Sequence, residues 1–540
     1  MNFFYFKSKT ILSAAWLLAG AALLSRVLGL VRDRILAGKF GAGDELDIYF
    51  AAFRIPDFLY NIVIAGAVSA AFIPVFISIY AKNKKEAWRT ANNFLNISIV
   101  TLFAAGLLLV FASPFLVRLV APGFDESKMA TTVLMTRIMF LSPLFLGLSA
   151  ILGAILNSFR RFFIYALAPV FYNLGIIFGA VVLVDSMGVY GLALGVIIGS
   201  FLHFIIQIPS IFFSGFSWQR IFDLGDRHFQ KIFFLMVPRS LGLVMFQINL
   251  WVITAIASVL PSGSISIFNL ANHLQFLPIG IIGYSFATAA MPSFAKSVSR
   301  EKAKLFCDQF IKTVRMVLFF VVPMSVLMFV LRAHTVRLIF GSGEFSWDDT
   351  RLTAAVLGIF CFGIFAHSLI PLFSKAFYAM QNTKTPVFIN SIGFFINIGL
   401  SILFVFILFK DPRVYGFISE FLDMGGIADI ALLGLPLAFS IAGIINLLIL
   451  YHALKKNMEG FWGASIYLAS IKILGASLGA GFAAYGTLFL VEPLFYTETV
   501  FGLLLQAGIA ATIGTLAYIV IMAIFRSQEL FLICRKIKKI

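Results

Sequence analysis

The second half of the chain repeats motifs of the first half, in the same order and at nearly constant spacing. Four short motifs return after 213 to 224 positions: Arg26–Val31 as Arg239–Val244, Ala71–Pro74 as Ala290–Pro292, Val117–Val120 as Val336–Ile339, and Asn173–Gly175 as Asn397–Gly399. Each match alone is weak because apolar helices are built from the same few residue types. Four matches in the same order at nearly constant spacing are not expected by chance. A repeat of this length predicts two similar lobes. In many membrane transporters the substrate site lies between two such lobes.

Composition places this repeat in a membrane. Of the 540 residues, 61% are hydrophobic and 12% are charged, and the mean hydropathy is +1.00. A soluble domain carries about 25% charged residues. Segments of about 20 apolar residues, long enough to cross a bilayer as a helix, recur along the whole chain. We therefore predict an all-α integral membrane protein.

Fourteen segments have the length and composition of transmembrane helices. They fall at roughly 11–37, 47–81, 90–120, 128–156, 164–184, 188–212, 229–260, 264–295, 309–331, 351–380, 386–409, 430–453, 464–490 and 499–525. The first segment runs into the repeated motif at Arg26, so we expect it to belong to the fold and not to a cleaved signal. The repeat predicts a six-helix lobe over 1–212 and a second over 213–455. Two further helices and a basic tail occupy 456–540.

The loops between these segments alternate in charge. The basic set includes Lys7–Lys9, Lys82–Arg89, Arg160–Arg161, Arg220–Lys231, Lys296–Lys304, Lys384, Lys455–Lys456 and Arg535–Lys539. The acidic set includes Asp44–Glu45, Asp125–Glu126, Asp185, Glu344–Asp349 and Glu492–Glu498. Because Lys and Arg stay in cytoplasmic loops, we predict that both termini are cytoplasmic and that the two lobes share one orientation. The net charge of +17 then reflects topology and attraction to anionic membrane lipids, and we expect no nucleic-acid binding.

Motifs of enzymes and of metal or nucleotide sites are missing from the sequence. Cys307, Cys361 and Cys534 lie far apart and have neither disulfide nor metal spacing. No HExxH motif, phosphate-binding loop or dinucleotide fingerprint occurs in a strand–turn–helix context. We therefore expect a protein that is not an enzyme and that holds no cofactor or metal.

Ionisable residues lie inside the first two predicted helices. They are Arg26, Arg32, Asp33 and Arg34 in the first helix, and Asp47, Arg54 and Asp57 in the second. A charge at the bilayer centre costs about 2.5–3.5 kcal/mol on insertion scales, so such residues face a protein or water-filled interior. Arg26 and Asp33 are seven positions apart and share a helical face. Since Arg26 lies about 23 Å along a helix that starts near Ile11, we expect it to line an internal cavity.

The other charges each have a structural alternative. Arg32 either lines the cavity or reaches the membrane interface with its long side chain. Arg54 either lines the cavity or forms an ion pair with Asp47. Arg239, beside Pro238 near the start of its span, either lines the cavity or lies at the interface.

A cavity lined by arginines favours an anionic substrate. Guanidinium groups bind phosphate through two parallel hydrogen bonds and keep their charge at all physiological pH values. An antiporter of cationic drugs would more naturally present buried carboxylates, and Asp33 and Asp57 keep that alternative open. Arginines outnumber carboxylates in these helices, so the sequence favours an exporter or flippase of a phosphorylated molecule.

Several motifs resemble one known family. They are Ser25–Gly29, Arg32–Asp33, Phe40–Gly43, Asp47, Ala52–Pro56, Gly66–Ala67, Ser69–Pro74, Ala121–Phe124, Gly153–Asn157, Ala376–Ala379 and Thr383–Val387. Together they are similar to motifs of the MurJ (MviN) lipid II flippases of the multidrug/oligosaccharidyl-lipid/polysaccharide exporter superfamily. The resemblance implies two six-helix lobes plus two C-terminal helices that form a lipid-facing groove. It also implies export of an undecaprenyl-pyrophosphate-linked peptidoglycan precursor across the bacterial cytoplasmic membrane by alternating access.

The resemblance carries over only part of the family's site. Arg26, Arg32, Asp33 and Asp47 match charged positions that family members use in the cavity. The family usually has an arginine where this chain has Tyr60, a glutamate at Ala65, and an Asp-Arg pair at Asn272–His273. His273 either replaces an arginine as a phosphate donor or is a hydrogen-bonded core histidine.

The resemblance leaves coupling and partners open. The family's acidic sodium-site residues have no clear counterpart, so sodium, another ion or the membrane potential each stay possible as the coupling force. We expect a lipid-linked substrate, anionic membrane lipids around a monomer, and possible contacts with cell-wall synthesis proteins. The alternatives are an exporter of another polyprenyl-linked saccharide, a cation antiporter of the same fold, and a non-transporting scaffold in cell-wall assembly.

Overall fold

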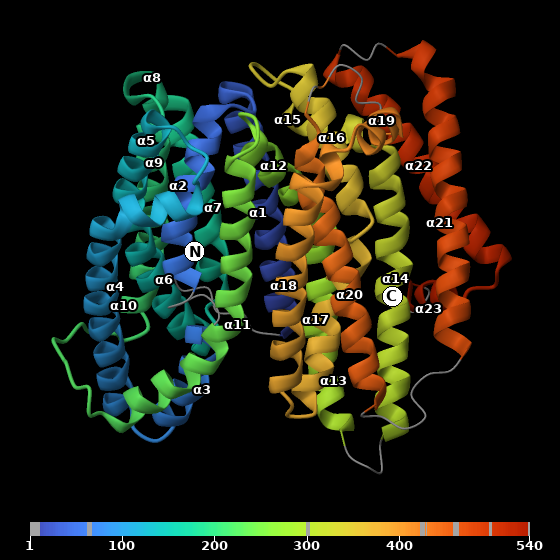
Figure 1. Cartoon of the computed structure of the whole chain (residues 1–540). Helices are drawn as coiled ribbons and strands as arrows, with labels where there is room; N and C mark the ends of the chain where they lie inside the picture. Colours follow the sequence, from blue (N-terminus) through green and yellow to red (C-terminus); the bar gives the residue numbers. More distant parts are fainter. Residues whose placement is uncertain are drawn as a thin grey trace. The chain divides into compact units, whose positions relative to one another are not determined.

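The computed structural model describes residues 11–61, 67–298, 303–421, 427, 429–456, 464–495 and 499–537. This described part consists of helices and connecting loops and contains no strand (Figure 1). The predicted all-α class is therefore confirmed. By its contacts, the chain divides into two compact units: residues 1–266 with 342–345, and residues 267–341 with 346–540. These units are defined by contacts, whereas the predicted lobes are defined by the sequence repeat. The division into lobes 1–212 and 213–455 and a region 456–540 therefore stays a prediction.

The first unit contains the helices that carry most of the predicted site. Its elements are α1 (Ile11–Phe40), α2 (Asp44–Tyr60), α3 (Ala67–Tyr80), α4 (Lys84–Val120), α5 (Glu126–Met139), α6 (Leu141–Ser158), α7 (Phe162–Phe178), a π-helical turn (Gly179–Leu183), α8 (Val184–Met187), α9 (Tyr190–Ile205), α10 (Ile208–Phe212) and α11 (Arg227–Ser258). The next helix, α12 (Ser264–Pro278), begins in the first unit and continues into the second.

The second unit holds the remaining helices. Its elements are a π-helical turn (Ile279–Gly283), α13 (Tyr284–Ser297), α14 (Ala303–Val330), α15 (Arg332–Phe340), α16 (Trp347–Cys361), α17 (Ile364–Ala379), α18 (Lys384–Phe406), α19 (Pro412–Phe421), α20 (Gly434–Lys456), α21 (Ala464–Val491), α22 (Val500–Ile524) and α23 (Gln528–Ile537), with short 3-10 turns at Leu408–Lys410, Ala431–Leu433 and Glu492–Leu494.

Each of the fourteen predicted spans overlaps one or more helices, but the count of fourteen stays a prediction. In the described part of the chain, ten helical stretches have the length and hydropathy to cross a membrane, or eleven if α16 and α17, bent by 46°, form one span. Three predicted spans do not meet this criterion: those that correspond to α1, to α2 together with α3, and to α11. The opening helices carry charged residues, residues 62–66 between α2 and α3 are not described, and α11 counts only through its apolar half, Val244–Ser258.

Side-chain caps fix where several helices of the first unit begin. The side chain of Asn83 accepts hydrogen bonds from the N–H groups of Lys85 and Glu86 at the start of α4. Asp125 and Asp226 cap α5 and α11 in the same way. Such caps satisfy backbone donors that have no partner inside the helix. They therefore fix the residues at which α4, α5 and α11 begin.

Glycines allow α7 and α9 to pack backbone to backbone. A Cβ atom on Gly175 would lie 2.2 Å from the Cα of Gly199, and one on Gly179 would lie 2.5 Å from the Cα of Gly195. Small residues are the usual means by which membrane helices approach closely. This packing fixes α7, which carries Asn173 toward α1.

Candidate functional site

Arg32 and Asp33 of α1 form a buried charged pair with Asn173 of α7. The Nε and Nη2 atoms of Arg32 donate to Oδ1 of Asp33 at 2.9 and 2.7 Å, and Nη1 donates to Oδ1 of Asn173 at 3.1 Å. Asn173 in turn donates to the backbone oxygens of Ser25 and Pro169. The side chain of Asp33 is almost fully buried and that of Arg32 is one-fifth exposed. Arg32 therefore bonds within the first unit, which favours the interior alternative over the interfacial one.

Arg26 lies on the same helix, two turns before Asp33, and is half-buried. Within the described part of the chain, the side chain of Arg26 forms no hydrogen bond or ion pair, whereas Arg32 is held by two residues. The two arginines of α1 thus differ in how far their guanidinium groups are already committed to protein partners.

The next charges lie on α2 and contact α11. Nε of Arg54 donates to the hydroxyl of Thr254 at 2.9 Å, and the indole nitrogen of Trp251 donates to the backbone oxygen of Arg54 at 3.2 Å. Gln247, one turn before Trp251, donates to the carboxylate of Asp57 at 3.5 Å. Charged side chains of α2 are therefore matched by neutral polar side chains of α11.

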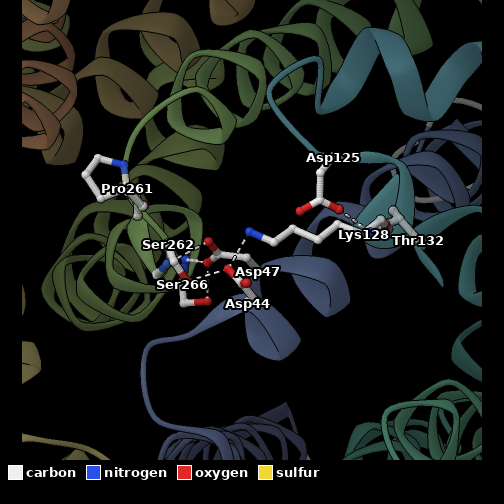
Figure 2. A network of polar contacts seen from close by, with 10 residues as sticks. Asp44, Asp47, Asp125, Lys128, Thr132, Pro261, Ser262 and Ser266 are labelled. Carbon is white, nitrogen blue, oxygen red and sulfur yellow. Dashed lines mark hydrogen bonds and ion pairs between the residues drawn. The ribbon is translucent and has the colours of Figure 1, made fainter. Parts of the chain in front are cut away.

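Asp47, near the start of α2, binds the beginning of α12. Its Oδ2 accepts from the N–H of Gly263 at 2.8 Å, and its Oδ1 accepts from the N–H and the hydroxyl of Ser266 at 2.7 and 2.5 Å (Figure 2). The side chain is buried. A carboxylate at a helix N-terminus is stabilised by the free N–H groups and by the helix dipole. Asp47 therefore ties α2 to the first turn of α12.

A second carboxylate extends this tie to α5. The ammonium group of Lys128 lies 2.6 Å from Oδ1 of Asp44, which also accepts a hydrogen bond from the hydroxyl of Ser262 (Figure 2). Burial raises the pKa of Asp44, but the bonds from Lys128 and Ser262 outweigh it and bring the pKa below its ordinary value. We call Asp44, Asp47, Lys128, Ser262, Gly263 and Ser266 the Asp47 cluster.

The backbone around the Asp47 cluster is tightly packed. Gly263 has a φ of +87°, and a Cβ atom on it would lie 2.0 Å from the backbone oxygen of Ala42. Gly123 donates its N–H to the hydroxyl of Ser258, and a Cβ on Gly123 would lie 2.2 Å from the backbone oxygen of Ser258. Glycine is required at Gly263 for both reasons, because other residues rarely adopt this φ.

For two predicted site residues, convergence with this group stays a prediction. Arg239 lies in α11, but its side chain is outside the described part of the structure. His273 is half-buried on α12 and belongs to the second unit, so its convergence with the arginines stays a prediction. Its neighbour Asn272 accepts a hydrogen bond from Gln275 at 2.7 Å.

Sequence reasoning missed the partners of these charges: Asn173, Thr254, Lys128, Ser262 and Ser266. One of them left a signal. Lys128 follows Asp125 and Glu126 in a loop that is otherwise acidic, and a lone lysine there breaks the alternation of loop charges. Its ion pair with Asp44 accounts for that exception. Asn173 appeared only as part of a repeated motif, and no pattern linked it to Arg32.

Comparison with known proteins identifies the class. The model of the family described as lipid II flippase MurJ matches residues 36–506. A probable lipid II flippase MurJ of Vibrio cholerae is 30% identical over 471 residues, which are 84% of this chain and 84% of that protein. A probable lipid II flippase MurJ of Rhizobium tropici is 27% identical over 535 residues, 96% of this chain and 95% of that protein.

Solved structures agree with the sequence matches. A lipid II flippase MurJ in an inward closed conformation is 28% identical, with a TM-score of 0.76 and coverage of 94% of this chain and 98% of that chain. An inward-facing multidrug resistance MATE family transporter of the MOP superfamily has 15% identity and a TM-score of 0.61, over 82% of this chain and 99% of that one. The second match shows the fold alone. The protein is thus a multi-span membrane protein with a transporter fold.

Within that class, the chain belongs to the lipid II flippase MurJ family. The resemblance inferred from the sequence motifs is confirmed.

Proposed function

We propose that this protein is a lipid II flippase that moves a polyprenyl-pyrophosphate-linked peptidoglycan precursor across the bacterial cytoplasmic membrane. The observation that carries the proposal is the buried charge of α1 and α2 in a chain of this family. Arg32 is held inside the first unit by Asp33 and Asn173, and Arg54 is held by Thr254. Charges are kept inside a membrane protein at a cost, so they mark a polar pathway.

The arginines would serve the pyrophosphate in two ways. Arg26 has no protein partner within the described chain, so its guanidinium is available for a bidentate contact with phosphate. Arg32 already donates to Asp33 and Asn173 through three N–H groups, and its guanidinium carries five such donors, so it retains capacity for a phosphate. Asp33 fixes the position of Arg32 and partly neutralises its positive charge. Weaker attraction for the pyrophosphate would allow the substrate to be released as well as bound.

The Asp47 cluster would act as a closure on one side of the pathway. It joins α2 of the predicted first lobe to α12, a helix of the predicted second lobe, through three hydrogen bonds to one buried carboxylate. Alternating access requires contacts that form in one state and break in the other. The N–H of Glu344 also donates to the backbone oxygen of Gly38 at 2.8 Å. Gly38 lies in the last turn of α1, shortly before Asp44 of the cluster.

Loop charges support an orientation with both termini in the cytoplasm and the Asp47 cluster on the outer side. A cysteine at Ser127, which is exposed at the start of α5, should then react with membrane-impermeant thiol reagents from outside. A cysteine at the exposed Lys82 should not. We choose Lys82 and not its neighbour Asn83, because the side chain of Asn83 caps α4 and its loss would disturb the start of that helix. The reverse labelling pattern would overturn the orientation. Coupling to sodium, to another ion or to the membrane potential would be compatible with this arrangement.

Rescue of a bacterium depleted of its own lipid II flippase tests the proposal. We expect growth with a normal cell wall and lipid II that reaches the outer leaflet. Expression at normal level without rescue would favour another polyprenyl-linked substrate or a scaffold role. Arg26→Ala should abolish rescue at normal protein level, and Arg26→Lys should restore it in part because an ammonium group lacks the bidentate fork. Arg118→Ala, at an exposed arginine of α4, is the matched control.

A further inference from the structure

An extended segment lies between α10 and α11 and follows the side of α4. Residues 217–224, which we call the strap, are not helical. Three buried asparagines of α4, Asn92, Asn93 and Asn96, hold its backbone. The bonds are Asn92 Nδ2 to Ser217 O (2.9 Å), Gln219 N to Asn92 Oδ1 (2.9 Å), Asn96 Nδ2 to Gln219 O (2.7 Å) and Ile221 O (3.1 Å), Asn93 Nδ2 to Asp223 O (2.7 Å), and Asp223 N to Asn93 Oδ1 (2.7 Å).

Large exposed side chains alternate along the strap with residues whose backbone the asparagines bind, from Ser217 to Asp223. Asn96 also accepts a hydrogen bond from the indole nitrogen of Trp218 at 3.0 Å, which fixes the orientation of that ring. The even-numbered side chains are exposed, at 51% for Trp218, 62% for Phe222 and 68% for Leu224. Arg220 is also exposed, and its guanidinium carbon lies 5.5 Å from the centre of the Trp218 ring. The outer row of the strap therefore reads Trp-Arg-Phe-Leu.

Both ends of the strap are fixed to the first unit. Before it, the buried ring of Phe216 packs against Trp88 of α4 at a centroid distance of 5.6 Å. After it, the ring of Phe229 in α11 packs against Phe94 at 6.1 Å. Asp223 also pairs with Arg89 at 3.4 Å. The strap therefore keeps its outer row in a fixed position relative to α4.

An extended segment enters the edge of a membrane only if its backbone is satisfied. Backbone N–H and C=O groups left without partners in a water-poor region cost several kcal/mol each. The asparagine side chains supply partners to six of the strap's backbone groups, on Ser217, Gln219, Ile221 and Asp223. Trp, with its apolar ring and polar nitrogen, is typical of the membrane–water interface, and Arg favours anionic headgroups. The helices on either side of the strap also expose phenylalanines: Phe212 of α10, and Phe233 and Phe234 of α11.

We propose that the strap is an interfacial anchor that binds the surface of an anionic phospholipid bilayer. Trp218, Phe222 and Leu224 lie at the boundary between headgroups and acyl chains, and Arg220 binds a lipid phosphate. The asparagine clamp makes the anchor rigid, so that α4 is held at a fixed depth. This inference concerns the lipid around the protein and does not depend on the transported substrate.

The test places spin labels on the full-length protein in vesicles of phosphatidylcholine with and without phosphatidylglycerol. Cys307 and Cys361 are buried, so Cys534→Ser provides a background without an exposed cysteine among the described residues. Labels at Phe222→Cys and, separately, at Leu224→Cys should collide readily with oxygen and severalfold less often with a water-soluble nickel complex. The label at Lys82→Cys, in the exposed turn before α4, should show the opposite order.

Two variants separate the parts of the proposal. Arg220→Gln should reduce the affinity of the strap for vesicles with phosphatidylglycerol, relative to vesicles of phosphatidylcholine alone, by about fivefold. This is the effect expected of one basic residue at an anionic surface. Asn93→Ala should release the label at position 222 toward water, while Ser98→Ala on the same helix should leave it in place. A label at 222 as accessible to nickel as that at Lys82 would overturn the anchor and would make the strap a surface for a protein partner. Equal depth in Asn93→Ala and the parent would overturn the role of the clamp.

Discussion

The Asp47 cluster allows the effect of one substitution to be worked out from its geometry. The Asp47 carboxylate accepts three hydrogen bonds, one from Gly263 and two from Ser266. A hydrogen bond to a charged group contributes about 1.5–3 kcal/mol, and a buried donor left without an acceptor costs about 1–3 kcal/mol. Asp47→Asn keeps the shape and one carbonyl oxygen but turns an amide NH2 group toward one of the donors. We expect a loss of about 3 kcal/mol of local stability at the start of α12, which raises the equilibrium constant for local opening roughly 150-fold.

Hydrogen exchange measured by mass spectrometry on the full-length protein in nanodiscs reports this opening directly. The N–H groups of Gly263 and Ser266 are donors to Asp47, so their exchange should accelerate in Asp47→Asn under conditions where reclosing is faster than exchange of the open N–H groups. Ser266→Ala removes only the hydroxyl bond and should have a smaller effect. Glu45→Gln, at an exposed residue in the same helical turn, should have none. Unchanged exchange in Asp47→Asn would refute the view that this carboxylate holds α12.

Three further predictions concern other parts of the site. Asn173→Ala should lower the thermal midpoint, and it should weaken rescue less than Arg32→Ala does, because Arg32 keeps its bond to Asp33 when Asn173 is lost. Equal effects of the two substitutions in rescue assays would contradict this. His273→Arg should retain rescue if position 273 contacts phosphate, and loss of rescue together with normal rescue by His273→Asn would assign it to packing. Because the folded-state pKa of Asp44 is lowered, its ion pair with Lys128 stabilises the protein above the unfolded pKa and is lost as the pH falls through the folded pKa. The thermal midpoint of the wild type should therefore fall more steeply than that of Asp44→Asn between about pH 5 and pH 3, and parallel curves would contradict the pairing.

The helices and the placement of the charges could be predicted because both follow from local composition. Apolar segments of sufficient length must form helices in a bilayer, where every backbone group needs a partner within the segment. Each predicted span accordingly overlaps a helix. Arg32, Asp33 and Asp47 were singled out because charge is rare inside such helices. The number of spans could not be fixed in the same way, since charged, bent or interrupted helices such as α1 and α16–α17 blur the criterion.

The partners of those charges could not be predicted because they come from distant parts of the chain. Asn173 lies 141 positions from Arg32, Thr254 lies 200 from Arg54, and Ser266 lies 219 from Asp47. Asn173 reaches its place through tertiary packing, in which glycines let α7 approach α9 closely. Spacing along one helix indicates which residues share a face. It does not say which residue of another helix completes the hydrogen bonds.

Three of the charged side chains of α2 form its ties to α11 and α12, so we infer that a transport cycle would act on this helix. Asp47 binds the start of α12, while Arg54 and Asp57 bind Thr254 and Gln247 of α11. Each of these bonds compensates a charge that is costly in a membrane. A state in which α2 separates from α11 and α12 must therefore supply water to these groups, or an anionic ligand to the guanidinium of Arg54. A phosphate that takes over the guanidinium of Arg54 would remove one tie between α2 and α11. Release of the Asp47 carboxylate would then still cost about 3 kcal/mol, which a hydrated opening has to offset.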